Sequence, residues 1–184
     1  GALTLVVPRR SDNTSHNEVS LLASAGLPSL ALRVPAHPVA QELLAAAQCP
    51  LAAPSANKSG QLSPTQASHV AKDFPNLPIL DGGACAKGLE STIIGCLQEE
   101  PVLLRRGSLD PSELEKTLGF KLNYLPEDDS QTAKLAPGRL ARHYAPQAGL
   151  RLNAVTVEQD EGLLAFGKNV PPCENKCLNL SNSG

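Results

Sequence analysis

The sequence contains no methionine and no tryptophan, and only 3% of its 184 residues are aromatic. So few rings exclude a base-stacking platform for nucleic acid, and the interior must be built from aliphatic side chains. A formal net charge of −2 excludes a generally basic nucleic-acid surface, so any contact with RNA would need a local patch. No apolar run reaches the roughly 18 residues typical of a membrane-spanning helix.

The absence of methionine extends to position 1, and the first residues lead directly into an apolar run, 3–7. The last residues, 178–184, have the composition of the middle of a structural element. No signal peptide opens the sequence. We therefore expect a cytoplasmic protein and a fragment of it that is cut at both ends.

Cysteine is present in a pattern that fits neither a disulfide framework nor a zinc site. The five residues are irregularly spaced, at Cys49, Cys85, Cys96, Cys173 and Cys177. The last two form a C-x3-C pair, but no second pair lies at the spacing of a zinc site. Reduced thiols are the better interpretation, and no protein-held metal is expected.

Strand-like and helix-like segments alternate along residues 1–120, which predicts a mixed α/β layer fold. Apolar, β-rich runs predict strands at 3–7, 30–34, 91–96 and 102–104. Apolar spacing predicts helices over 38–48, 63–74 and 110–118. The second helix would begin with Ser63 as N-cap and Pro64 in its first turn, and the third with a capping box from Asp110 to Glu113.

Residues 121–148 are polar, contain proline and lack apolar periodicity, which predicts an interdomain linker. Residues 1–120 would form the first domain. Residues 149–184 would begin a second domain, with predicted strands at 150–157 and 163–166.

The densest group of small polar side chains is Ala53-Pro54-Ser55-Ala56-Asn57-Lys58-Ser59-Gly60, with Ser63 close behind. Such a loop leaves backbone N–H groups accessible and can cradle phosphates, helped by the N-terminus of the helix that follows. An ordinary polar turn with Ser63 as a helix cap explains the same residues. The Walker pattern G-x-x-x-x-G-K-[ST] is absent.

Other candidate residues lie at the ends of predicted strands. Ser91 enters a strand from a glycine turn, where its hydroxyl either binds a polar ligand or solvates a hairpin. Arg105 ends a strand, and its guanidinium either pairs with phosphate or carboxylate or is a solvated surface group. Arg33 lies within an apolar run, where a charge is costly unless a ligand carboxylate or an internal acid pairs with it.

The segment 137–146 contains two arginines, a histidine and a tyrosine, which favours a function over an idle connection, although Tyr144 alone could dock the linker. The four histidines form no H-x-x-x-H pair, and no Ser-His-acid triad or carboxylate pair can be ordered from the sequence. No catalytic nucleophile is therefore assigned. The residues favour positioning and electrostatic stabilisation around phosphate.

Taken in chain order, these segments resemble the YrdC-type domain of the threonylcarbamoyl-AMP synthases. The resemblance covers residues 1 to about 148, and its motifs are Ala53-Pro54-Ser55-Ala56-Asn57, Ser63-Pro64-Thr65, Asp81-Gly82-Gly83, Glu90-Ser91-Thr92, Leu104-Arg105-Arg106-Gly107 and His143-Tyr144-Ala145-Pro146. The last motif resembles the linker of two-domain members. The resemblance implies a YrdC-like open twisted sheet with flanking helices, a linker and the start of a small Rossmann-like domain.

The family implies an enzyme, a nucleotidyltransferase that forms L-threonylcarbamoyladenylate and pyrophosphate from L-threonine, bicarbonate or CO2, and ATP, with Mg2+ accompanying the nucleotide. Separate transferase machinery would pass the threonylcarbamoyl group to adenosine 37 of tRNA. Contact with tRNA or double-stranded RNA is part of this expectation.

The resemblance also assigns site residues by motif. Threonine would be bound by Arg33, Ala53 and Ser91, with Arg33 on its carboxylate. ATP would be bound by Ser29, Ser55, Asn57, Ser63, Arg105, His143 and Tyr144. Arg105 would pair with the phosphates, and the last two residues would close the linker over the nucleotide.

Two departures from the family pattern affect this expectation. Nothing before Gly1 corresponds to the family's N-terminal part, with its Lys/Arg-rich nucleotide motif and part of the threonine pocket, so we expect the isolated chain to be inactive or unstable. Residues 139–141 read Arg-Leu-Ala where the family more often has Met-Lys-Tyr.

Two other functions remain open. A YrdC-like module of a hydrogenase-maturation carbamoyltransferase is disfavoured, because the linker is present and zinc spacing is absent. A non-catalytic RNA-binding module is disfavoured by the net charge and by the few aromatic residues.

Overall fold

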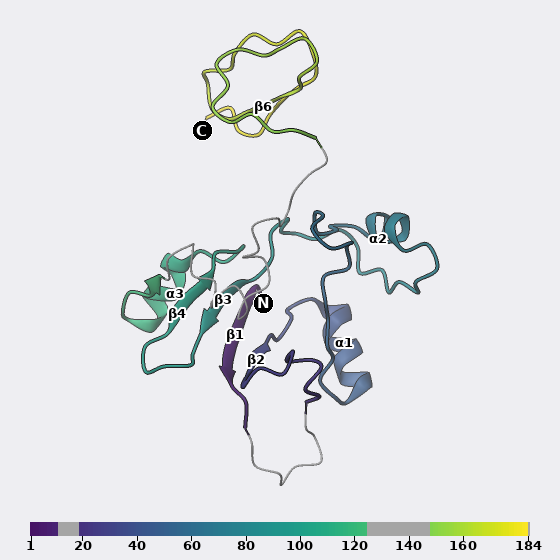
Figure 1. The fold of residues 1–184 in the computed structure, drawn as a ribbon, viewed down its shortest axis with the longest axis vertical. Coiled ribbons are helices and arrows are strands. Elements are labelled where there is room, and N and C mark those ends of the chain that lie inside the picture. The colour runs from purple at the N-terminus through teal and green to yellow at the C-terminus, as the bar shows by residue number, and fades with distance from the viewer. Residues whose placement is uncertain (11–18, 125–147, 184) are drawn as a thin grey trace. The chain divides into compact units, whose positions relative to one another are not determined.

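The computed structural model describes residues 1–10, 19–124 and 148–183, and it consists of two units, Gly1–Ala145 and Pro146–Gly184. The first unit contains β1 (Leu3–Pro8), β2 (Ser29–Leu32), α1 (Pro38–Ala47), α2 (Ala67–Asp73), β3 (Thr92–Gly95), β4 (Val102–Arg105), α3 (Pro111–Leu118) and β5 (Asn123–Tyr124) (Figure 1). The second contains β6 (Leu163–Ala165) and β7 (Cys177–Asn179). These bounds confirm the strands expected near 3–7, 30–34, 91–96, 102–104 and 163–166 and the helices expected over 38–48 and 110–118.

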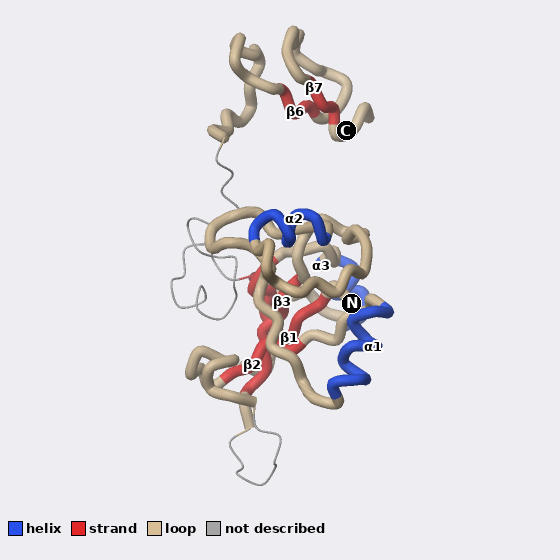
Figure 2. The backbone as a smooth tube through the Cα atoms, turned by 90° about the vertical axis from the view of Figure 1, so that its right-hand side faces the viewer, coloured by secondary structure: helices blue, strands red, loops and turns tan. Residues whose placement is uncertain are grey.

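The strands of the first unit form one mixed sheet in the order β2-β1-β3-β4-β5. β1 is parallel to β3 and β4 is parallel to β5, whereas β1 is antiparallel to β2 and β3 to β4. The sheet lies between α3 on one side and α1 and α2 on the other (Figure 1), and Figure 2 shows the molecule from the side of α1 and α2, with strands in red and helices in blue. The predicted mixed α/β class with flanking helices is thus confirmed.

An aliphatic cluster lies on each face of this sheet. One cluster consists of Val6, Ile93 and Leu104. The other consists of Ile94, Leu103 and Leu122, with Leu114 of α3 packed against it. The scarcity of aromatic residues predicts cores of this kind, because aliphatic side chains alone must remove the sheet from water.

Helix α3 begins after Asp110, the N-cap residue that the sequence predicts. The Asp110 carboxylate accepts a hydrogen bond from the backbone N–H of Ser112 at 2.9 Å, and Pro111 occupies the first turn. This hydrogen bond, with smaller contributions from Lys116, lowers the pKa of Asp110 below its ordinary value. Gly119, with a φ of 80°, ends the helix in the left-handed conformation.

Helix α2 begins later than expected, and the prediction of Ser63 as its N-cap is wrong. The helix starts at Ala67 with Gln66 at the N-cap position. The Ser63 hydroxyl instead donates to the Glu90 carboxylate, a residue far along the chain. A charged acceptor outcompetes the local backbone N–H groups that a capping serine would otherwise bind.

Helix α1 has ten residues and ends at Gln48, which adopts the left-handed conformation with a φ of 52°. None of its residues is buried. Among the residues that the structure describes, no helix combines the length and apolar character needed to cross a bilayer.

The sheet continues into the segment that the sequence assigns to the linker. Leu122 is 3% exposed, and its N–H donates to the Glu115 carboxylate at 2.9 Å. Asn123 and Tyr124 then pair with β4. Residues 121–124 therefore belong to the first unit, whereas 125–147 lie outside the described residues.

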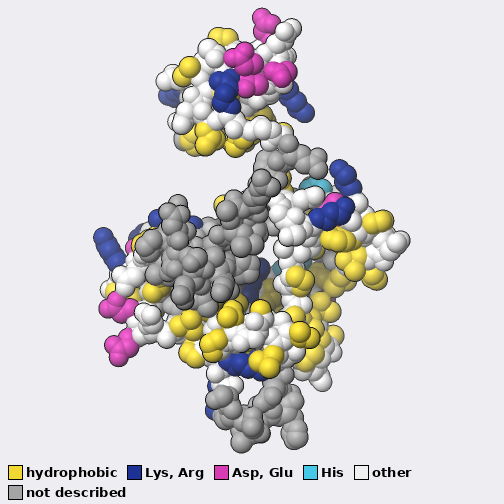
Figure 3. Space-filling view, viewed as in Figure 1, with side chains coloured by type: hydrophobic (Ala, Val, Ile, Leu, Met, Phe, Trp, Pro, Cys, Tyr) yellow, Lys and Arg dark blue, Asp and Glu magenta, His cyan; other side chains and the backbone are white. Residues whose placement is uncertain are grey.

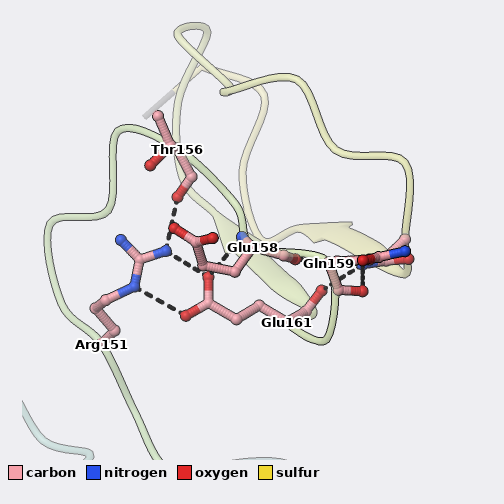
Figure 4. A network of polar contacts seen from close by, with 6 residues as sticks. Arg151, Thr156, Glu158, Gln159 and Glu161 are labelled. Carbon is pink, nitrogen blue, oxygen red and sulfur yellow. Dashed lines mark hydrogen bonds and ion pairs between the residues drawn. The ribbon is translucent and has the colours of Figure 1, made fainter.

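The second unit contains a two-stranded parallel sheet, but the strand predicted over 150–157 is absent and the prediction is wrong. Arg151 turns back within this segment, donating to the Glu161 carboxylate through Nε at 2.8 Å and to the Thr156 carbonyl through Nη2 at 2.8 Å (Figure 4). Asn153, with a φ of 55°, interrupts any extended backbone. The Rossmann-like character of this unit stays a prediction.

Gly107 provides a stability test of the first unit, because the chain after β4 passes directly over the start of β3. A Cβ atom at Gly107 would lie 2.4 Å from the backbone carbon of Ser91 and the nitrogen of Thr92. We expect Gly107→Ala to lower the free energy of unfolding by about 1–3 kcal/mol in denaturant titrations, since backbone atoms must shift to admit the methyl group. Gly88→Ala, with nothing within 4 Å of its Cβ, is the matched control. Equal effects of the two substitutions would contradict the close approach.

Glu161 provides a pH test of the second unit. The Arg151 side chain and the backbone N–H of Glu158 hold the pKa of Glu161 at about 2, below its ordinary 4.5. A lowered folded-state pKa stabilises the fold above pH 4.5, and this stabilisation is lost as the pH falls toward 2. We therefore expect the Glu158 amide signal to titrate with a midpoint near 2 in NMR spectra, and acid destabilisation to weaken in Glu161→Gln. Glu174→Gln, at an exposed position of the same unit, should leave both unchanged, and a midpoint near 4.5 would refute the assignment.

Candidate functional site

Strand directions bring functional residues together at one edge of the sheet. β1 and β3 begin at this edge, whereas β2 and β4 run the other way and end there. Arg33 directly follows β2, Ser91 directly precedes β3, and Arg105 is the last residue of β4. Three residues that are distant in the sequence therefore share one edge.

Ser91 is held from two sides at this edge. Its hydroxyl lies 2.6 Å from the hydroxyl of Thr4 in β1, and the two residues are 7% and 9% exposed. The Arg105 guanidinium donates to the Ser91 carbonyl through Nη2 at 2.9 Å and Nε at 3.2 Å, and Nη2 lies 3.4 Å from the hydroxyl. A residue assigned to threonine thus directly contacts one assigned to ATP.

A β-bulge aims Arg105 at this contact. The pairing of β3 with β4 shifts register between Ile93 and Ile94, so that Ile93 lies opposite Arg105 and Ile94 opposite Leu103. Bulges re-aim side chains by turning neighbouring residues of the bulged strand toward the same face. Leu104 can therefore pack in the core while Arg105 remains on the face of Ile93 and reaches Ser91.

The loop before α2 meets the loop before β3 beside the same edge. The Ser63 hydroxyl donates to the Glu90 carboxylate at 2.5 Å, and the Cys85 N–H donates to the Thr65 carbonyl at 2.8 Å. The loops border a depression of about 690 Å³, lined by Leu62, Ser63, Pro64, Thr65, His69, Lys72, Asp73, Gly88, Leu89 and Glu90. Because Glu90 directly precedes Ser91, this depression adjoins the Ser91–Arg105 contact.

Apolar side chains are exposed on the side of the first unit that carries α1 (Figure 3). Leu43 of α1 is 45% exposed, and Leu62 and Leu89 at the depression are 59% and 68% exposed. The polar contacts of Ser63 are therefore bordered by apolar surface, a combination typical of sites for small organic ligands.

Asn57 stabilises the loop to which it belongs. Its Nδ2 donates to the carbonyls of Lys58 at 2.9 Å and Gln61 at 3.1 Å. Its Oδ1 is buried and has no hydrogen-bond partner among the residues that the structure describes. The amide nitrogen, and not the amide oxygen, therefore closes the loop that leads to Ser63.

Arg33 is not inside a strand, and the argument that burial forces a partner on its charge is wrong. β2 ends at Leu32 and is an edge strand whose last two residues are exposed. Arg33 is itself exposed, and its Nε donates to the carbonyl of Gly1 at 3.1 Å. An edge strand leaves such a side chain in water, so the apolar run around it does not bury it.

Ser29, Ala53 and Ser55 make no contact with the Ser91–Arg105 pair among the hydrogen bonds of the described residues. Ser29 is 5% exposed and pairs with Pro8, at the opposite end of β2 from Arg33. Ala53 and Ser55 are exposed in the loop between α1 and α2. His143 and Tyr144 lie outside the described residues.

Two residues of the edge had no role in the sequence analysis, Thr4 and Glu90. Thr4 had a weak signal, as the one hydroxyl side chain in an apolar strand. Glu90 stood in a recognised motif, but its contact with Ser63 joins segments that no local pattern connects. Only the meeting of the two loops makes this contact visible.

The family model described as "Telomere recombination", which covers Sua5, YciO and YrdC proteins, matches residues 1–107. The chain belongs to this family. The matched residues include Thr4, Arg33, Ser91 and Arg105, so the whole edge described above lies within the Sua5/YrdC region.

Several curated Sua5/YrdC relatives are named threonylcarbamoyl-AMP synthase. The Bacillus subtilis (strain 168) protein is 38% identical over 166 residues, which are 89% of this chain and 46% of the relative. The Pyrococcus abyssi protein is 42% identical over 151 residues, 80% of this chain and 43% of the relative. The Schizosaccharomyces pombe protein is 38% identical over 168 residues, which are 87% of this chain and 41% of the relative. This chain therefore spans less than half the length of each relative.

Solved structures of P. abyssi Sua5 have the same fold. One, described as a complex with L-threonine, matches with a TM-score of 0.72 and 40% identity, covering 91% of this chain and 45% of the solved one. Another is a variant in which a histidine and the tyrosine after it are replaced by alanine, with a TM-score of 0.64, 33% identity, and coverage of 91% and 42%.

Asn57→Asp tests the loop of this Sua5/YrdC site. The substitution keeps the side-chain size but places a carboxylate oxygen where Nδ2 now meets the two carbonyls of Lys58 and Gln61. We expect faster hydrogen exchange over residues 58–63 and a loss of about 1–3 kcal/mol of local stability. The reason is that the amide N–H donors are replaced by a carboxylate oxygen, which the two carbonyl oxygens repel. Exchange within β3 is the internal control, and unchanged exchange over 58–63 would show that Asn57 does not close the loop.

Proposed function

We propose that the protein containing this chain is an L-threonylcarbamoyladenylate synthase, a nucleotidyltransferase that uses L-threonine, bicarbonate or CO2, and ATP. The observation that carries the proposal is the contact of Ser91 with Arg105 at the edge of the sheet where Arg33 also lies. Two arginines and a buried hydroxyl suit a ligand with carboxylate and phosphate groups. The names of the relatives and the L-threonine complex of P. abyssi Sua5 support this choice of ligands.

At the threonine end, Arg33, Ala53 and Ser91 are the proposed contacts. The exposed Arg33 guanidinium is available to a carboxylate that enters from the sheet edge, since in the described part of the chain only its Nε donates, to the Gly1 carbonyl. The Ser91 hydroxyl supplies a second polar contact. Ala53 would contribute its backbone from the loop after α1.

At the ATP end, the proposed contacts are Ser29, Ser55, Asn57, Ser63, Arg105, His143 and Tyr144. The depression at Ser63 and Glu90 supports the nucleotide position, because polar and apolar lining occur together there. The adjacent pair His143-Tyr144 corresponds in kind to the adjacent histidine and tyrosine replaced in the P. abyssi Sua5 variant.

The reaction requires these two ends to meet. The threonine amine and bicarbonate form a carbamate with loss of water, and a carbamate oxygen then bonds to the α-phosphorus of ATP as the bond to the β-phosphate oxygen breaks. Pyrophosphate leaves with the electron pair of that bond. Ser91 and Arg105, in contact across 2.9 Å, would hold the amino acid and the phosphates next to each other.

Mg2+ is part of the proposal as a companion of the nucleotide. The Glu90 carboxylate and the Ser63 hydroxyl are hard oxygen donors of the kind that this ion accepts beside phosphates, so the residues present fit it. The ion would neutralise phosphate charge. The described residues contain no group of three or more His, Cys, Asp or Glu side chains that could hold a metal alone.

The product would be consumed by threonylcarbamoyl-transfer machinery acting on adenosine 37 of tRNA, in the cytoplasm. The names of the relatives support threonylcarbamoyl-AMP as the product, and the destination of that product is what the family resemblance implies. Contact of this chain with tRNA or double-stranded RNA is proposed only as a local patch, given the net charge of −2.

The test uses the gene product that contains residues 1–184. Pyrophosphate release from ATP and bicarbonate is measured with and without L-threonine, and we expect release that depends on L-threonine. Pyrophosphate release that does not depend on L-threonine, or no pyrophosphate release, would contradict the proposal. The carbamoyltransferase would then be tested with carbamoyl phosphate, and the RNA-binding module by salt-dependent RNA binding without ATP turnover.

Arg33→Gln sharpens this test. Loss of a charged hydrogen bond to a carboxylate should raise the KM for L-threonine roughly 10- to 100-fold and leave the KM for ATP within about 2-fold. Lys116→Gln, a charge-matched change at an exposed position of α3, is the control and should alter neither constant. A rise in the KM for ATP alone would contradict the threonine assignment and indicate that Arg33 binds the nucleotide.

A further inference from the structure

The hydroxyl pair formed by Thr4 and Ser91 is buried at the edge of the sheet, and the proposed function gives no role to Thr4. The two oxygen atoms are 2.6 Å apart, so one hydroxyl donates its proton to the other. Both residues lie on the same face of adjacent parallel strands, at the end of the cluster that contains Val6 and Ile93. The strand register fixes this approach.

The direction of the hydrogen bond follows from the partners that each hydroxyl has. A hydroxyl donates one hydrogen bond and accepts up to two. Within residues 1–10, 19–124 and 148–183, Ser91 is the one hydrogen-bond partner of the Thr4 hydroxyl. If Ser91 donated to Thr4, the Thr4 proton would stay buried without an acceptor even with substrate bound, whereas a Ser91 proton finds its acceptor in the ligand that the proposed function places beside Ser91. Thr4 therefore donates and Ser91 accepts.

Arg105 completes the arrangement around Ser91. Its Nη2, which can only donate, lies 3.4 Å from the Ser91 hydroxyl. With Thr4 and Arg105 both donating to the Ser91 oxygen, its accepting capacity is used. The Ser91 proton then points away from both donors and is available to a ligand.

We propose that Thr4 is a positioning residue that turns the Ser91 hydroxyl into an obligatory donor, so that Ser91 recognises an acceptor oxygen of the amino acid, its carboxylate, and not its ammonium group. This inference rests on the proposed function. A carboxylate is the fitting ligand atom because Arg105 adds positive charge at Ser91, which an ammonium group would oppose.

The test compares Thr4→Val, Thr4→Ser and Ser91→Ala in the gene product that contains residues 1–184. Valine keeps the shape of threonine but cannot donate, so the Ser91 proton can turn toward other acceptors. We expect Thr4→Val to raise the KM for L-threonine roughly 3- to 10-fold with little change in the KM for ATP, and Thr4→Ser to stay within about 2-fold of the unsubstituted protein.

The double variant Thr4→Val with Ser91→Ala separates positioning from general structural damage. If Thr4 acts through Ser91, adding Thr4→Val to Ser91→Ala changes the KM for L-threonine no further, whereas independent structural effects would add. Additive effects, or an unchanged KM in Thr4→Val, would overturn the role of Thr4 alone. An unsubstituted protein that does not use L-threonine would overturn the proposed function and the inference with it.

Discussion

The buried side chain of Thr92 is the contact on which the arrangement of the first unit depends. Thr92 is 0% exposed, and its hydroxyl donates to the Leu109 carbonyl at 2.6 Å and accepts from the Leu109 N–H at 3.2 Å. Its backbone N–H donates to the Ala2 carbonyl at 2.9 Å. One residue thus ties β3 to the start of β1 and to the turn before α3. A hydroxyl this deeply buried is stable because its proton has an acceptor and its oxygen has a donor.

The hydrogen bonds of Thr92 also hold the residues of the site that directly precede it. Glu90 and Ser91 directly precede Thr92, and the backbone at Gly107 passes close over all three. Loop residues that bind ligands work best when a fixed scaffold holds them, since less ordering is needed on binding. The residues that reach the edge come from segments far apart in the sequence, and the parallel pairing of β1 with β3 brings them together.

Local patterns predicted the elements of the fold well where local chemistry decides. Asp110 caps α3 because its carboxylate meets an N–H two residues away, and the run at 3–7 forms β1 as its β-rich composition favours. The predictions failed where a distant partner decides. Ser63 donates to Glu90 and not to the helix that follows, and Arg151 turns back to Glu161 and prevents a strand.

The same division holds for the site. Family motifs named Arg33, Ser91 and Arg105 from the sequence, and the structure adds that all three lie at one edge. It could not be predicted that Arg33 is exposed, because an apolar run looks the same in an edge strand and in a central one. Nor could the bulge between β3 and β4 that aims Arg105 be found, since it is a property of the pairing of two strands.

The two serines of the site differ in what they offer a ligand. Ser63 gives its proton to a carboxylate, so its oxygen has only lone pairs left and faces a cation such as Mg2+ or a hydrogen-bond donor such as a ribose hydroxyl. A phosphate oxygen, which only accepts, is a poor partner for it. Ser91 receives hydrogen bonds on two sides and faces an acceptor. The neighbours of each hydroxyl, Glu90 in one case and Thr4 with Arg105 in the other, therefore decide which end of a substrate it can hold.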